Sequence, residues 1–143
     1  MKHPVLRGVY INPTYGIAEE RTIPDNYASL KATLGTERTY IYGMSIRTRR
    51  GPLSVRITTG QQDIYAERDE MVSCKDKDGN PLLHGNLFIT SDDGEYATSL
   101  TPKEVGLVLQ RVLFNVIHDQ DNADNTYVTV ALTKCTPICM VEP

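Results

Sequence analysis

Four arginines fall within ten residues of this chain, and two tyrosines come shortly before them. The residues are Arg47, Arg49, Arg50 and Arg56, with Tyr40 and Tyr42 upstream. Guanidinium forks bind phosphate and carboxylate groups through paired hydrogen bonds, and tyrosine rings can stack on a nucleobase. We therefore take these six residues as the candidate binding site for an anionic ligand. The competing interpretation is that the charges keep a hairpin edge from pairing with other chains.

Metal chemistry has weaker support in the sequence. A zinc site would have to combine Cys74, Cys135 and Cys139 with His84 or His118. Such sites normally use two close ligand pairs. This chain has one such pair, Cys135 and Cys139, with three residues between the two cysteines. Small buried thiols in the reduced state explain the three cysteines better. The prediction is therefore that the protein needs no metal and no cofactor.

Catalytic signatures are also missing from the sequence. A serine or cysteine nucleophile needs a paired base, and none of the three histidines stands in a local catalytic motif. No catalytic residue is predicted for this reason. The enzymatic alternative is a protein that processes a nucleotide or nucleic acid. In that case Arg49 or Arg50 would hold the phosphate, and His84 or His118 would act as acid or base.

The element that must position the arginines is a hairpin. Apolar residues alternate with polar ones in Glu37–Thr48 and again in Leu53–Thr59, as expected for half-buried strands. The connection between the two arms is Arg49–Pro52. A hairpin of this kind would gather the four guanidinium groups within a small area.

The strongest helix signal begins at Thr101. Thr101, Pro102 and Glu104 form the pattern of a capping box with proline in the first turn. Apolar residues then recur at helical spacing as far as Ile117. The sequence therefore predicts one long amphipathic helix at about 101–117, packed on the sheet. The inward residues would be Val105, Val108, Leu109, Val112 and Val116.

Three further segments complete the predicted order of elements. A short helix is expected at about 26–34, ending at Gly35, and a last strand at Tyr127–Thr133. The segment 134–143 holds two prolines and is expected to be an irregular tail. Strands followed by a helix indicate an α+β fold with a mainly antiparallel sheet, built as a single domain over 1–143. The last strand and the apolar tail could also join two copies into a homodimer.

Composition narrows the functional classes. The chain has 143 residues and a formal net charge of −3, which argues against a general nucleic-acid binder, although a specific nucleic-acid contact stays open. No apolar run reaches the length of a membrane span, and the start lacks the apolar core of a signal peptide. We therefore expect a cytoplasmic protein.

The turns and caps resemble those of an uncharacterised family of small proteins from phages, prophages and mobile elements. The resemblance covers residues 5–117 and rests on short motifs. These are Asn12-Pro13, Leu30–Gly35, Asp78-Gly79 with Pro81-Leu82, Gly85–Ile89, Asp93-Gly94 and Ser99–Thr101.

The resemblance implies an accessory protein that acts by binding in a bacterial host cell. Its partner would be a host defence complex that it blocks, or an anionic small ligand such as a nucleotide signal that it sequesters. A homo-oligomeric structural or regulatory protein is a further alternative. The family supplies no catalytic residues to carry over.

Overall fold

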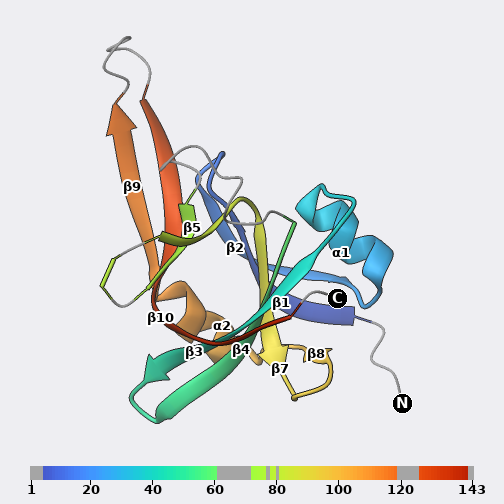
Figure 1. Cartoon of the computed structure of the whole chain (residues 1–143). Helices are drawn as coiled ribbons and strands as arrows, with labels where there is room; N and C mark the ends of the chain where they lie inside the picture. Colours follow the sequence, from blue (N-terminus) through green and yellow to red (C-terminus); the bar gives the residue numbers. More distant parts are fainter. Residues whose placement is uncertain (1–4, 61–71, 77, 80, 119–125, 142–143) are drawn as a thin grey trace.

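The computed structural model describes residues 5–60, 72–76, 78–79, 81–118 and 126–141, which form ten strands and two short helices (Figure 1). The elements in chain order are β1 (Val5–Asn12), β2 (Ile17–Pro24), α1 (Tyr27–Leu34), β3 (Tyr40–Thr48), β4 (Gly51–Thr59), β5 (Val72–Asp76), β6 (Pro81–His84), β7 (Leu87–Asp92), β8 (Ala97–Thr98), α2 (Pro102–Leu109), β9 (Val112–His118) and β10 (Thr126–Val141).

The strands hydrogen-bond into one continuous sheet. Its order is β2-β1-β7-β4-β3-β10-β5-β6, with β8 beside β7 and β9 beside β10. All neighbouring strands run antiparallel except β10 and β5, which are parallel. In Figure 1 the β9–β10 pair extends away from the remaining strands.

The larger hydrophobic core, which we call the inner core, lies inside the curve of this sheet. It combines side chains from strands that are far apart in the sheet order, including Val9 of β1 and Leu83 of β6. Strands at such distant places can share a core only if the sheet bends around it. Helix α2 adds Val105 and Val108 to the same core, so the helix covers part of the interior.

A second, smaller core lies on the other face of the sheet, under α1. It contains Leu6, Tyr10, Ile23, Leu34 and Phe88. The sequence makes room for the Phe88 ring at position 8, because an ideal Cβ on Gly8 would lie 2.8 Å from the ring carbon Cζ. Real side chains do not pack that closely, so only glycine fits at this crossing of β1 and β7.

The prediction of an α+β fold with a helix over 101–117 is wrong, because the chain is mostly strand. Only Pro102–Leu109 is helical, and Val112–His118 forms β9. The second half of the predicted helix is rich in β-branched and aromatic residues, which favour strands. Its partner is β10, which pairs residue by residue from Leu132 opposite Val112 to Thr126 opposite His118. Tertiary pairing has overridden the helical spacing of the apolar residues.

The start and the end of α2 each have a clear local cause. The capping box is confirmed: Glu104 N donates to Thr101 Oγ1 at 3.1 Å, and Thr101 N donates to Glu104 Oε1 at 2.9 Å. Just beyond the helix, the carbonyl oxygen of Arg111 accepts from both the backbone N and the Oγ1 of Thr133, each at 2.8 Å. These bonds to β10 turn the chain from the helix into β9.

The short helix is confirmed as α1. Asn26 caps its start by accepting from Ser29 N at 2.8 Å, and Gly35 ends it with a φ of 72°. This left-handed conformation is one that glycine adopts at little cost.

The irregular tail was predicted for 134–143, and as far as Val141 this segment is instead the second half of β10, while 142–143 lie outside the described residues. Its backbone pairs with β3 from Cys135 opposite Ile46 to Val141 opposite Ile41. The register shifts between Pro137 and Cys139, so a bulge accommodates the proline, which lacks an N–H group for the ladder. Proline therefore interrupts this strand locally without ending it.

Candidate functional site

Arg49 and Arg50 occupy the tip of the predicted hairpin, which the structure confirms as β3 and β4. Thr48 pairs with Gly51, so the two arginines alone form the connection. The Thr48 hydroxyl donates to the Gly51 carbonyl at 2.6 Å and accepts from Arg50 N at 3.2 Å. Both arginine side chains are exposed. The turn thus holds two cations at a fixed place on the surface.

A groove of about 590 Å³ lies between the hairpin tip and α2. Its lining comes from both elements and from the turn that follows the helix: Thr48, Arg49, Arg50, Lys103, Leu107, Gln110 and Arg111. A smaller hollow of about 240 Å³ shares Thr48, Arg50, Lys103 and Leu107 with it and adds Glu104 to the margin. We call the larger space the cationic groove.

The side chain of Arg111 fastens the two walls of the cationic groove together. Its guanidinium donates a hydrogen bond to the carbonyl oxygen of Arg47, at the end of β3. Its own carbonyl is held by Thr133 of β10. Arg111 therefore links the turn after α2 to the end of β3 through its side chain, and to β10 through its carbonyl.

The charges that line the groove are not neutralised within the described part of the chain. Its ion pairs are Arg7–Glu20, Arg21–Glu19 and Arg56–Asp92, and none includes Arg49, Arg50, Lys103 or Arg111. Glu104, at the margin, is engaged in the capping box. Four cations thus surround one space in a chain whose net charge is −3. Such an arrangement attracts phosphate and carboxylate groups.

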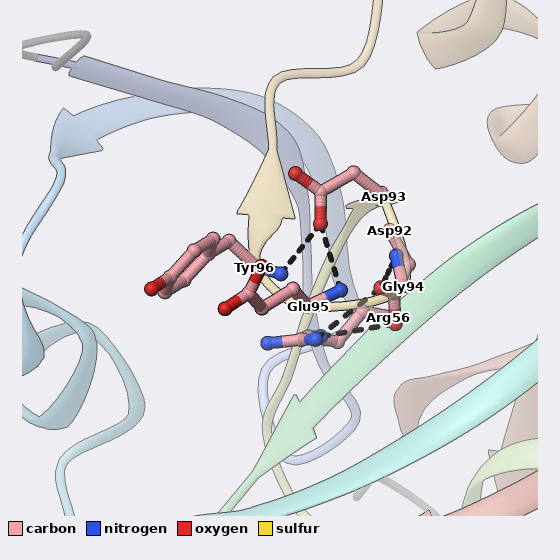
Figure 2. A network of polar contacts seen from close by, with 6 residues as sticks. All are labelled: Arg56, Asp92, Asp93, Gly94, Glu95 and Tyr96. Carbon is pink, nitrogen blue, oxygen red and sulfur yellow. Dashed lines mark hydrogen bonds and ion pairs between the residues drawn. The ribbon is translucent and has the colours of Figure 1, made fainter. Parts of the chain in front are cut away.

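Arg56 is not part of this groove. Its guanidinium binds both carboxylate oxygens of Asp92, with Nε to Oδ2 at 3.1 Å and a terminal nitrogen to Oδ1 at 3.2 Å (Figure 2). The two side chains are only 15% and 20% exposed. This forked ion pair joins β4 to the end of β7, so the structure uses Arg56 within the fold.

The other proposed binding residues are also separated from the hairpin tip. Tyr40 pairs with Thr59 and Tyr42 with Ile57, at the opposite end of the hairpin. At about 3.3 Å per residue, Tyr42 lies about 20 Å along the strand from Thr48. Tyr42 packs against the inner core, and the Arg47 side chain is exposed beside the groove without lining it. Of the six residues, the structure brings only Arg49 and Arg50 into the groove, and a binding role for the set stays a prediction.

Sequence reasoning missed the other wall of the groove. Lys103, Leu107, Gln110 and Arg111 follow at intervals of four, three and one, so they fall on one side of a helix. That spacing was the available signal. The prediction for this segment considered only the inward, apolar residues of the expected helix, and none of these four is among them.

The turn after β7 holds a carboxylate, that of Asp93, whose pKa is lowered (Figure 2). Asp93 Oδ1 accepts from Tyr96 N at 2.6 Å and from Glu95 N at 2.8 Å. These backbone donors, led by Tyr96, stabilise the ionised form and lower the pKa of Asp93 below its ordinary value of 3.8. The side chain therefore stays charged in mildly acidic solution and stabilises the turn.

This lowered pKa predicts an acid-side effect of Asp93→Asn. The unfolded chain binds the proton more tightly than the folded one, so ionised Asp93 stabilises the fold above pH 3.8. That contribution is lost as the pH falls through the lower pKa of the folded state. We expect the stability difference between wild type and Asp93→Asn to be constant near neutrality and to shrink below pH 3.8. Urea unfolding at several pH values measures it, and a difference that grows on acidification would contradict the assignment.

The remaining candidates for chemistry show no assembled site. The described residues contain no group of three side chains that could hold a metal ion. Cys74 is buried in the inner core, and His84 is only 8% exposed in β6. The backbone of Cys135 and Cys139 belongs to β10, and their side chains lie outside the described part. His3 and the His118 side chain lie outside it as well.

Comparison with known proteins finds no matching family model, no matching curated protein and no matching solved structure. The resemblance to a family from phages and mobile elements therefore stays a prediction. Of the two helices in the described part of the chain, neither is long and apolar enough to cross a membrane.

Proposed function

We propose that this protein binds a phosphate-bearing ligand of nucleotide size in the cationic groove, and that it acts by binding rather than by catalysis. The observation that carries the proposal is the convergence of four cations, which form no ion pair with another described residue, on one groove. The volume of about 590 Å³ falls in the range of small-molecule sites, about 300–1,000 Å³.

The lining favours a ligand with both a charged and an apolar part. Arg49, Arg50, Lys103 and Arg111 supply donors for phosphate oxygens. Leu107, half-buried between Lys103 and Arg111, supplies an apolar surface on which a sugar or base can rest. Gln110 adds an amide that can both donate and accept a hydrogen bond. A nucleotide combines these features.

The accessory role expected from the family resemblance is compatible with this ligand. Between the two branches of that expectation, the groove favours sequestering a nucleotide signal over blocking a host protein complex. A stable protein interface covers about 800 Å² on each partner, which is far more surface than seven residues provide. We therefore propose that any anti-defence role results from capture of the nucleotide rather than from contact with a host protein complex.

The test measures binding of ATP and of uncharged adenosine by calorimetry. We expect ATP to bind and adenosine to bind at least tenfold more weakly. The double variant Arg49→Ala/Arg50→Ala should lose at least tenfold in ATP affinity, because two charge-assisted contacts contribute about 1.5 kcal/mol or more each. The affinity for ATP should also fall as the salt concentration rises from about 50 to about 300 mM, because salt screens the attraction between the groove cations and the phosphates.

The matched control is Lys31→Ala/Arg38→Ala, which removes the same charge at two residues that do not line the groove. It should bind ATP as the wild type does. Equal losses in both double variants would show that only net charge matters. No binding of ATP or inorganic pyrophosphate by the wild type, or turnover of ATP that His84→Ala abolishes, would defeat the proposal.

A further inference from the structure

Strand β9 is an outer strand with an open side. In the described part of the chain it pairs with β10 and with no other strand. The backbone donors and acceptors on its other side therefore form a row that another strand can join. Leu113 is 44% exposed and Phe114 is 54% exposed. Because neighbouring residues of a strand point to opposite faces, both faces of β9 carry an exposed apolar side chain.

Two other outer strands, β2 and β6, are protected in ways that β9 is not. β2 carries Glu19, Glu20 and Arg21, and charge on an edge discourages pairing with other chains. β6 is only four residues long and begins with a proline. β9 has seven residues and no charged residue between Val112 and Ile117. An edge of this length and composition favours pairing with another strand.

The sequence of β9 is complementary to itself in an antiparallel register. If Asn115 faces Asn115 of a second copy, Leu113 falls opposite Ile117, and Phe114 opposite Val116. Every apolar residue from 113 to 117 then meets an apolar residue, and such cross-strand pairs stabilise a sheet. A two-fold axis is the symmetry that joins identical edges in this way. The pattern therefore favours a second copy of this chain over an unrelated strand.

We propose that the protein forms a two-fold symmetric dimer in which β9 pairs antiparallel with β9 of a second copy, with Asn115 at the axis. The proposal is independent of the ligand of the cationic groove. It also moves the dimer contact one strand outward from the Tyr127–Thr133 segment expected from the sequence. That segment cannot use the same side for a second copy, because β9 already pairs with it.

Opposite charges at position 115 test both the dimer and its axis. Wild type should show a mass by light scattering that rises with concentration from 16.0 kDa towards twice that value. Asn115→Lys and Asn115→Glu each place like charges face to face and should weaken self-association at least tenfold. An equimolar mixture of the two variants should recover a mass near twice 16.0 kDa, because residue 115 then faces its opposite charge.

Two further variants separate the contact from general effects of charge. Phe114→Lys changes an exposed side chain and should also give a monomer, with an unchanged circular dichroism spectrum. This variant therefore still tests the dimer if the variants at position 115 do not fold. Thr22→Lys adds the same charge to β2 and should leave the dimer intact.

The proposal fails if wild type stays at 16.0 kDa at all concentrations, or if Phe114→Lys still dimerises. It also fails if the mixture of Lys and Glu variants stays monomeric while each variant is folded. A foreign polypeptide bound to a monomeric chain through β9 would equally overturn it.

Discussion

The Val108→Asp chain is expected to be unfolded, or to lack a cooperative unfolding transition, at room temperature. Val108 is 0% exposed and joins α2 to the inner core. A carboxylate there would have no partner, and its burial costs several kcal/mol in addition to the lost apolar contacts. Because a domain is stable by about 5–15 kcal/mol, this cost removes most or all of the stability. Far-UV circular dichroism and urea unfolding measure the effect.

Gly106→Asp is the matched control for this experiment. It places the same charge on the same helix, two residues away, on the exposed side. An ideal Cβ at this position meets no atom within 4 Å, so the side chain has free space. We expect stability within about 0.5 kcal/mol of wild type. A normal transition for Val108→Asp would show that α2 does not pack on the sheet as described.

The second large effect is expected for Phe88→Ala. Phe88 is 0% exposed and is the largest fully buried side chain among the described residues. It joins the sheet to α1 in the smaller core. Truncating a buried phenylalanine costs about 3–5 kcal/mol, since the cavity that remains is only partly refilled. At about 3 °C per kcal/mol, the melting temperature should fall by about 10–15 °C.

Tyr15→Ala serves as the control, because Tyr15 is 77% exposed. Its loss should change the free energy of unfolding by no more than about 0.5 kcal/mol. Differential scanning calorimetry compares the two variants. A Phe88→Ala chain that melts with wild type would mean that the cluster under α1 is not packed.

Much of the local structure could be predicted from the sequence. The capping box at Thr101 and the glycine that ends α1 follow from conformational preferences of a few consecutive residues. Such preferences act within one turn of chain and need no distant partner. For the same reason, the hairpin tip with its two arginines was found as half of the candidate site. The hairpin was also predicted, but with Arg49–Pro52 as its connection, whereas Gly51 and Pro52 belong to β4.

The boundary between α2 and β9 was decided by tertiary structure. The apolar residues from Val105 to Ile117 fit a helix by their spacing, while Val112–His118 fits a strand by its residue types. The two signals conflict, and neither is strong enough in a short segment to prevail. Pairing with β10 satisfies one side of the β9 backbone over seven residues, and the Arg111 carbonyl accepts hydrogen bonds from Thr133, which fixes the turn.

The second wall of the cationic groove depends on the same boundary between α2 and β9. Lys103 and Arg111 become neighbours of Arg50 only because α2 stops at Leu109 and Arg111 reaches the carbonyl of Arg47. The contact joins residues 64 positions apart in the chain. The sequence by itself therefore determined the caps, the turns and two of the four cations, since local preferences govern them. The strand pairing, the curve of the sheet and the groove depend on which distant segments meet, and only the tertiary structure decided these.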